Sequence, residues 1–444
     1  MGPAGRAGRP ARRAERAGGP AVTAAGAAPR RARTFLRRRQ AAPVCSDHRI
    51  DLLQGAGEFF DALIRDMDAA LSDIQFETYI FDCTGAGSRV VEAFIRAARR
   101  GVRVHVAVDG VGCMGGLPSP WPERLAEAGV QWQVYSAPGR FGLLWPKRWR
   151  RLHRKLCVID GCVLYCGGIN VLDDFHDPNH GALQAPRFDF AVRVVGSLVA
   201  EASDTMEQLW WRMRAVRDAR RHRLGDALAD LRAASAARLA AAHEARRPQG
   251  MRAMLVLRDN VRHRSRIEQA YLRAIGTARH EIIIANAYFM PGAKLRRALV
   301  LAARRGVRVR LLLQGRYEYF MQYHAARPVY GVLLEAGVEI HEYSPSFLHA
   351  KVAVVDAEGE RPWATVGSSN LDPLSMLLAR EANVVVEDAA FAQDLRGRLV
   401  HAMAHAGEQL GPACYAGRPL RQRLLDRAAF ALMRAALWVT GHRY

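Results

Sequence analysis

The chain has 444 residues, half of them apolar, which allows two or three domains with a large buried core. Its 65 Lys and Arg residues outnumber 43 Asp and Glu residues, and the formal net charge of +22 favours a polyanionic partner, either nucleic acid or an anionic membrane surface. The seven cysteines lack the tight pairing of a disulfide framework or a zinc site, which indicates a reduced, cytoplasmic chain. No run of about 18 apolar residues occurs, so we expect any membrane contact to be peripheral, at the cytoplasmic face of the inner (cell) membrane.

Residues 1–44 consist mostly of Ala, Gly, Pro and Arg and are predicted to form a disordered basic arm. After this arm, "EFFDALIRDMDAALSD" at residues 58–73 has the period of an amphipathic helix and precedes a predicted strand, "FETYIFD". A second helix ends with Gly101 as its C-cap, and the β-rich run "VRVHVAVDG" follows. Strands that alternate with helices predict the α/β class, with a largely parallel or mixed sheet flanked by helices.

The same order of elements returns in the second part of the chain. "AARRGVRV" occurs at residues 97–104 and, 205 residues later, at residues 302–309, where Gly306 is the predicted C-cap. We therefore expect two duplicated β/α domains packed about a pseudo-twofold axis. The expected boundaries are a first half at residues 45–215, a helical linker at 216–250, a second half at 251–410 and an amphipathic tail at 411–444.

Two nine-residue segments, "LHRKLCVID" and "LHAKVAVVD", repeat three polar residues in register. The first copy contains His153, Lys155 and Asp160, and the second contains His349, Lys351 and Asp356. Side chains two apart on a strand point to the same side, so each histidine is expected to project together with its lysine. Each copy continues into a Gly-x-x-Asn turn, which ends at Asn170 or Asn370. The two aspartates stand at turn ends, where they either belong to the catalytic set or anchor the turn.

Brought together across the twofold axis, these side chains would suit a phosphodiester. Ammonium and amide groups stabilise negative charge on phosphate oxygens, while one imidazole attacks phosphorus and the other protonates the departing oxygen. Because the lysines already neutralise this charge, we expect no metal and no cofactor. Each imidazole also needs an acidic partner on its second nitrogen. The candidates are Asp189 in "RFDFAVRV" and Glu381 in "REANVVV", which begin apolar β-like runs; a surface acid at a strand start is the alternative.

The doubled motif resembles the HKD signature of the phospholipase D superfamily, and the resemblance covers about residues 45–410. Within it, "LLQGAGEFFDALIRDMDAALSDIQFETYIFD" and "HRKLCVIDGCVLYCGGIN" look like bacterial cardiolipin synthases. The resemblance implies a phosphatidyltransferase that moves a phosphatidyl group from phosphatidylglycerol to a second phospholipid headgroup. It also implies that His153 forms a covalent phosphohistidine and that His349 is the general acid and then the base.

The residues alone do not assign which histidine attacks, and a phospholipase D-type hydrolase or a nuclease acting on another phosphodiester is the alternative function. The two copies also differ slightly. The loop "GGIN" of the first half corresponds to "GSSN" in the second, and the turn between the aspartate and the glycine is longer in the second half. The equivalence of the halves is therefore approximate.

Two further segments bear on the substrate. Residues 139–150, "GRFGLLWPKRWR", combine aromatic and basic residues in the manner of a membrane interface; packing on the domain itself or stacking on bases is the alternative. In the C-terminal tail, Arg423, Arg427 and Arg434 share one helical stripe beside a broad apolar face, which suits either an interfacial helix or a helix docked on the second half. We expect contact with anionic phospholipids rather than nucleic acid. The cluster "HDPNH" at residues 176–180 could suggest a metal, but a loop explains it as well, and we predict none.

Overall fold

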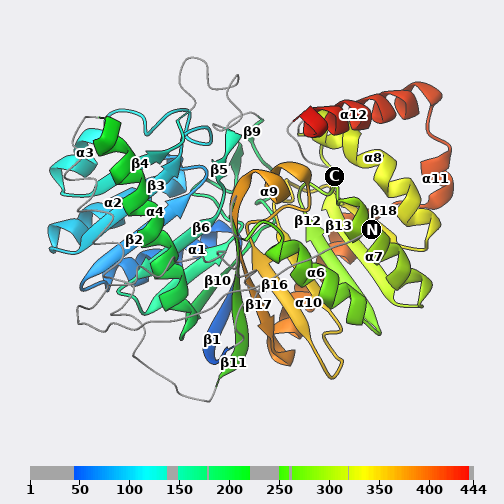
Figure 1. Cartoon of the computed structure of the whole chain (residues 1–444), viewed down its shortest axis with the longest axis horizontal. Helices are drawn as coiled ribbons and strands as arrows, with labels where there is room; N and C mark the ends of the chain where they lie inside the picture. The colour runs from blue at the N-terminus through cyan, green and yellow to red at the C-terminus, as the bar shows by residue number, and fades with distance from the viewer. Residues whose placement is uncertain are drawn as a thin grey trace, which may run out of the picture. The chain divides into compact units, whose positions relative to one another are not determined.

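The computed structural model describes residues 45–137, 149–177, 180–220, 250–259, 263–318 and 320–439. The expected basic arm, most of the aromatic and basic segment at residues 139–150 and most of the expected linker at residues 216–250 lie outside this part of the chain. The described residues form two halves with a matching order of strands and helices (Figure 1).

The first half begins with a strand and then alternates helices with strands. Its elements are β1 (Cys45–Gln54), α1 (Gly55–Asp68), β2 (Asp73–Thr78), α2 (Gly85–Arg99), β3 (Arg103–Asp109), α3 (Trp121–Glu127), β4 (Gln131–Tyr135), β5 (Arg151–Leu152), β6 (Lys155–Ile159), β7 (Val163–Gly167), β8 (His176–Asp177), β9 (Gly181–Ala182), β10 (Phe190–Val195) and α4 (Leu198–Arg220).

The second half repeats this order and adds further elements at its C-terminal end. Its elements are β11 (Met251–Arg258), α6 (Arg266–Thr277), β12 (Glu281–Asn286), α7 (Ala293–Arg304), β13 (Arg308–Gln314), α8 (Phe320–Glu335), β14 (Glu339–Tyr343), β15 (Lys351–Val355), β16 (Trp363–Gly367), α9 (Pro373–Leu377), β17 (Ala379–Glu387), α10 (Ala389–Ala406), β18 (Gly407–Gln409), α11 (Pro412–Ala416) and α12 (Leu420–Val439).

The strands form a mixed sheet whose two parts have the same strand order. From the centre outwards, the first part runs β1-β10-β7-β6-β2-β3-β4 and the second runs β11-β17-β16-β15-β12-β13-β14, with β18 at the edge. In each part the last three strands of this order are parallel and the neighbouring pairs nearer the centre are antiparallel. The equivalent strands β1 and β11 meet antiparallel in the middle, as a twofold relation requires. The predicted duplicated α/β fold is confirmed.

The verbatim repeat ends each half's second helix in the same way. Gly101 follows α2 with a φ of 90°, and Gly306 follows α7 with a φ of 88°. A left-handed residue after the last helical turn lets the chain reverse into the next strand, and glycine adopts this conformation at low cost. The C-cap residues themselves are Arg100 and Arg305, and the predicted glycines stand one position after them. Both helices therefore lead directly into the strands β3 and β13.

A hydrophobic core on one face of the sheet extends through both halves. It contains Val192 of β10 and Val384 of β17, and the helices α4 and α10 cover it with Val199 and Leu395. The opposite face carries separate cores, formed with α1 and α2 in the first half and with α6, α7 and α8 in the second. Burial of apolar surface stabilises the folded state by about 25 cal/mol per Å². The core shared by both halves therefore holds them against each other, and a site at their interface depends on this fixed arrangement.

The C-terminal helix α12 docks on α8 with one face and exposes the other (Figure 1). Asp426 is buried at this contact, where its carboxylate lies 2.7 Å from His324 Nδ1 and 2.8 Å from an Arg418 nitrogen. The exposed side chains of the outer face include Leu420, Leu424, Leu425 and Leu432 together with Arg421, Arg423, Arg427 and Arg434. The helix is thus docked on the second half, and its outer face combines leucines with arginines.

Candidate active site

Both histidines lie on segments that pair with the opposite half. β5 runs parallel to the start of β17, and the His153 N–H donates to the Arg380 carbonyl at 3.1 Å. In the reciprocal contact, the His349 N–H donates to the Phe188 carbonyl at 2.9 Å. Arg380 and Phe188 directly precede the two acids that the sequence singled out. Each histidine is therefore positioned beside the acid that belongs to the other half.

The acid pairs are crossed between the halves. His153 Nδ1 lies 3.0 and 3.1 Å from the two carboxylate oxygens of Glu381, and His349 Nδ1 lies 2.7 Å from Asp189 Oδ2. Nδ1 carries the hydrogen in both rings when these contacts are hydrogen bonds, which leaves the lone pair on Nε2 for chemistry. His349 Nδ1 also lies 2.7 Å from Lys351 Nζ, so in this ring the assignment holds when Nδ1–H donates to Asp189 instead of accepting from the lysine. The sequence singled out Asp189 and Glu381 as candidate acid partners from their positions at the start of β-like runs. The spacing along the chain did not indicate that each acid would pair with the histidine of the opposite half.

The strands β3 and β13 support the segments that carry the histidines. At the end of β3, the buried Asp109 accepts a hydrogen bond from the Leu152 N–H at 2.7 Å. At the end of β13, Gln314 Oε1 accepts one from the Leu348 N–H at 3.2 Å. Each bond holds the residue directly before a histidine, so the parallel strands of each half set the position of its own imidazole.

The two lysines are buried in the same region. Lys155 Nζ donates to the His153 carbonyl at 2.7 Å and lies 5.4 Å from the centre of the Tyr79 ring, and Lys351 Nζ donates to the His349 carbonyl. Burial lowers the pKa of Lys155 to about 7 and that of Lys351 to about 8, against the attraction of the neighbouring acids. A phosphate anion would offset this loss of hydration and restore both ammonium charges.

The imidazoles and their acids respond to the same burial. Burial lowers the pKa of His153, the two lysines lower it further, and Glu381 opposes both effects. The pKa of His349 falls well below its ordinary value, because burial and then the two lysines disfavour its cation. Burial raises the pKa of Asp189 to about 6. Burial also acts to raise the pKa of Glu381, but the attraction of His153 and Lys155 and the hydrogen bonds from His153 and Ser368 together lower it. Both imidazoles are therefore neutral near pH 7 before an anion enters.

The loops "GGIN" and "GSSN" differ at the position that contacts the acid, which is Asp189 in the first half and Glu381 in the second. A Cβ atom on Gly168 would lie 2.3 Å from Asp189 Oδ1, so the first half has no room for a side chain there. The corresponding Ser368 donates its hydroxyl to Glu381 Oε2 at 2.5 Å. Gly168 thus makes room for the carboxylate of Asp189, the acid partner of His349.

The two asparagines occupy different surroundings. Asn170 Oδ1 accepts a hydrogen bond from the Ile80 N–H at 3.1 Å, and this residue lines the cavity that both histidines share. Asn370 is 2 % exposed, and within the described residues its Oδ1 has no hydrogen-bond partner and its side chain is not part of that lining. Only Asn170 is therefore placed with the histidines in the cavity.

The two aspartates of the repeated motif lie elsewhere. The Asp160 carboxylate accepts hydrogen bonds from the backbone N–H groups of residues 71–73 at 2.7 to 2.9 Å. The Asp356 carboxylate does the same for residues 279–281 at 2.7 to 2.9 Å. Each carboxylate closes the turn between a helix and the strand β2 or β12. This geometry supports the anchoring alternative for both aspartates.

A cavity of about 140 Å³ opens beside both histidines and takes its walls from both halves. The described residues that line it include Tyr79, Asn170, Asp174, Asp177, Arg187, Asp189, Tyr288 and Glu318 as well as His153 and His349. The Tyr79 ring packs on the His153 ring with 4.8 Å between centroids. The sequence reasoning missed Tyr79, Arg187, Tyr288 and Glu318. Arg187 could have been predicted from the sequence, because it stands two residues before Asp189 in an extended segment and its side chain therefore faces the same side.

The histidine-containing loop at residues 176–180 supports Arg187. Asp177 Oδ2 lies 2.6 Å from an Arg187 nitrogen, and Asp177 Oδ1 lies 3.0 Å from His180 Nδ1. Arg187 also donates to the Asp173 carbonyl. The Asp177 carboxylate therefore holds an arginine at the cavity wall.

Two equivalent His-x-Lys segments, held beside the opposite half's acids in a duplicated mixed sheet, define a protein of the phospholipase D superfamily. The family model described as "Cardiolipin synthase, PLD-like domain" matches the chain twice, at residues 63–184 and 271–402. The chain belongs to this family of cardiolipin synthases and is a phosphatidyltransferase.

Individual relatives agree with this assignment. The chain is 37% identical to cardiolipin synthase B of Escherichia coli K12 over 355 residues, which cover 79% of each protein. It is 27% identical to cardiolipin synthase A of Edwardsiella ictaluri over 390 residues, 88% of this chain and 76% of the relative. The fold matches the crystal structure of phosphatidylserine synthase from Haemophilus influenzae with a TM-score of 0.64 at 15% identity, covering 90% of this chain and 96% of that one.

Proposed function

We propose that the chain forms cardiolipin by moving a phosphatidyl group from phosphatidylglycerol to the headgroup of a second phospholipid, through a phosphohistidine. The observation that carries this proposal is the crossed arrangement of His153 with Glu381 and His349 with Asp189 beside one cavity. Two neutral imidazoles with acid partners can serve as nucleophile and as proton carrier. Two buried lysines are available to neutralise the phosphate between them.

In the first step, His153 Nε2 attacks the phosphorus of phosphatidylglycerol, and the N–P bond forms as the bond from phosphorus to the glycerol oxygen breaks. His349 in its protonated form gives its proton to that oxygen, and glycerol leaves. Negative phosphate charge beside His349 raises the pKa of this imidazole and supplies the protonated form that the step needs. Glu381 accepts a hydrogen bond from the Nδ1–H of the phosphohistidine and so stabilises its positive charge, as an acid partner does for a histidine that gains charge.

In the second step, neutral His349 Nε2 takes the proton from a primary hydroxyl of the acceptor headgroup. The hydroxyl oxygen attacks phosphorus, the N–P bond breaks, and His153 is released as cardiolipin forms. The positions of Lys155, Lys351 and Asn170 support a role in holding the phosphate oxygens in both steps, and we propose the same role for Asn370. The acceptor is a lipid hydroxyl rather than water only if the site excludes water while the intermediate exists.

We further propose that the protein works as a peripheral protein on the cytoplasmic face of the inner membrane, whose anionic lipids supply the donor. The outer face of α12, with exposed leucines beside arginines, supports this because it has the pattern of a helix that lies in a bilayer interface. The net charge of +22 adds attraction to anionic headgroups. Within the described residues, no helix combines the length and apolarity needed to cross a bilayer. The segment at residues 139–150 remains a second predicted contact.

The test is to incubate the purified protein with phosphatidylglycerol vesicles and to separate the lipids, together with the variants His153→Ala and His349→Ala. We expect cardiolipin and free glycerol from the wild type and only a small residual rate of either product from the variants. Phosphatidic acid in place of cardiolipin would mean that water is the acceptor and would replace the transferase by a hydrolase. No lipid turnover would refute the proposal and direct the test to oligonucleotide substrates.

A further inference from the structure

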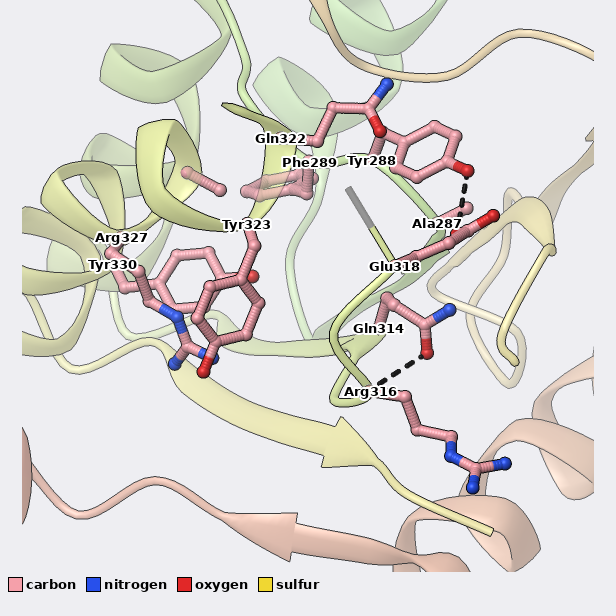
Figure 2. Close-up of a pocket in the computed structure, with 11 residues that line it drawn as sticks. Ala287, Tyr288, Phe289, Gln314, Arg316, Glu318, Gln322, Tyr323, Arg327 and Tyr330 are labelled. Carbon is pink, nitrogen blue, oxygen red and sulfur yellow. Dashed lines mark hydrogen bonds between the residues drawn. The ribbon is translucent and has the colours of Figure 1, made fainter. Parts of the chain in front are cut away.

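A second, smaller cavity adjoins the catalytic cavity on the side of the second half. Its volume is about 30 Å³, and it shares Tyr288 and Glu318 with the catalytic cavity. Figure 2 shows Gln314, Arg316, Glu318 and Tyr288 toward one side of it and Tyr323, Arg327 and Tyr330 toward the other. The Tyr288 hydroxyl donates to Glu318 Oε2 at 2.8 Å, so these two residues form the wall between the cavities.

Hydrogen-bonding capacity remains unused around this smaller cavity. Gln314 Nε2, Arg316 Nη1 and Gln322 Oε1 are buried and have no hydrogen-bond partner within the described residues. The Gln314 amide has a fixed orientation, because its Oε1 accepts from the N–H groups of Leu348 and Arg316 at 3.2 and 3.4 Å. Its NH₂ group is therefore turned away from those bonds. Buried polar groups without partners are costly, which makes this cavity a candidate site for a ligand with matching polar groups.

The first half has no counterpart of this polar set. When the offset of 205 between the two "AARRGVRV" segments is continued, Gln314 corresponds to Asp109 and Arg316 corresponds to Val111. The Asp109 carboxylate is used up by backbone N–H groups of residues 111, 112 and 152, at 2.7 to 3.1 Å. Val111 is an apolar side chain with 41 % exposure. The duplicated site is thus asymmetric beside His349, and an asymmetric feature must serve a task that the two halves do not share.

Donor and acceptor lipids create such a task. The phosphate of the donor reacts between the histidines, whereas the acceptor brings a second phosphate that does not react and needs its own cation. Arg187, which lines the catalytic cavity, is already bound to Asp177 and the Asp173 carbonyl. Arg316 instead has an unpaired nitrogen, and its guanidinium lies 5.5 Å from the centre of the Phe347 ring, in the segment that leads to His349.

We propose that Gln314 and Arg316, with the Tyr288–Glu318 pair, form the acceptor subsite, in which Arg316 binds the acceptor's own phosphate diester. This proposal rests on the proposed function, because it places the acceptor beside His349 as the base. Gln314 and Glu318 bind the hydroxyls of the acceptor's polyol headgroup, and a departing glycerol occupies the same place in the first step. The phosphate contact of Arg316 is then specific to a phospholipid acceptor.

The test separates acceptors with and without a phosphate. Wild type and Arg316→Gln are incubated with phosphatidylglycerol vesicles and radiolabelled glycerol, and both cardiolipin and labelled phosphatidylglycerol are measured. We expect the variant to lose cardiolipin synthesis about ten- to hundredfold, the range for a charged hydrogen bond, and to keep glycerol exchange within about twofold. Equal losses in both reactions, or no loss in either, would overturn the proposal.

Two further variants sharpen the result. Gln314→Glu keeps an acceptor oxygen for the Leu348 N–H but replaces the NH₂ donor with a negative charge, so it too should lower cardiolipin synthesis more than glycerol exchange. Arg308→Gln is the matched control, because Arg308 lies on the same strand, is exposed and pairs with Glu339 at 2.8 Å; it should leave both reactions unchanged. A wild type that makes no cardiolipin would refute the proposed function itself, whereas active wild type with equal losses in Arg316→Gln refutes only the subsite.

Discussion

At the scale of single residues, the lysines of the site are poised between charged and neutral forms. Burial brings the pKa of Lys155 to about 7 and that of Lys351 to about 8, far below the usual value of 10.5 for lysine. An ammonium group is present below its pKa and is lost as the pH rises through it. Because an anion between the lysines favours their charged forms, anion binding and lysine protonation are linked.

We therefore expect the affinity for a simple phosphodiester to fall as the pH rises above about 7, where Lys155 loses its proton, and to fall more steeply above about 8, where Lys351 does the same. Dimethyl phosphate suits the measurement because it carries one negative charge over the whole range, and calorimetric titration between pH 6 and pH 9.5 gives its dissociation constant. Each lysine that loses its proton weakens binding by up to about tenfold per pH unit. In Lys351→Met the remaining dependence should belong to Lys155 alone. A wild-type affinity that does not change across this range would contradict the link.

The sequence pointed to candidate reactive residues because a duplicated chain repeats the residues of a shared site in both halves. His153 and His349 recur within matching flanks, so chance and packing were both poor explanations for them. Arg316 and Glu318 were missed for the opposite reason, since nothing in the first half repeats them. Asp160 was placed in the catalytic set because its recurrence looked the same as that of the histidines, although a turn anchor is repeated for structural reasons alone.

At the scale of the elements, Asp160 and Asp356 fix the turns that lead into β2 and β12. The carboxylate of each aspartate gathers three consecutive backbone N–H groups. Both aspartates have a positive φ, 52° and 46°, which short polar side chains tolerate better than most others. β2 and β12 in turn pair with β6 and β15, the strands of the two lysines.

We expect Asp160→Ala to lower the free energy of unfolding by about 1–3 kcal/mol, because it leaves backbone donors unpaired. The folded variant should keep transferase activity of the same order as the wild type. Although burial acts in the other direction, the hydrogen bonds hold the pKa of Asp160 below its ordinary value of 3.8. Its stabilisation is thus present above that value and is lost as the pH falls through the lower folded pKa. Urea unfolding at pH 7 and pH 3 measures both effects, and a large loss of activity with unchanged stability would return Asp160 to the catalytic set.

At the scale of the whole molecule, the interface between the halves completes both histidine sites. The elements of each half follow from the alternation of helical and strand patterns, which the sequence contains locally. The crossing of His153 with Glu381 does not, because it depends on β5 pairing with β17 and on the core shared by both halves. The two crossed contacts join residues 228 and 160 positions apart and leave no periodic pattern in the chain.

Since Glu381 serves the histidine of the other half, we expect Glu381→Gln to impair the reaction at His153. Transfer from phosphatidylglycerol should fall about 10²-fold or more, in the range of general acid–base contributions. The double variant His153→Ala with Glu381→Gln should be no slower than His153→Ala alone, because the two residues act as a unit. Glu387→Gln, on the same strand but paired with Arg252 at 3.1 Å, is the control. Penalties that simply multiply in the double variant would argue against the crossed pair.

The reciprocal exchange of acids has an evolutionary consequence. A lone half would hold a histidine and an acid that cannot reach each other, so a single-domain ancestor could complete the site only as a homodimer, with two identical centres. Once two copies were joined in one polypeptide, the two halves of the site no longer had to have the same sequence. Gly168 and Ser368, or Asp109 and Gln314, could then change independently, and one ancestral surface could specialise for the lipid that gives the phosphatidyl group while the other specialised for the lipid that receives it.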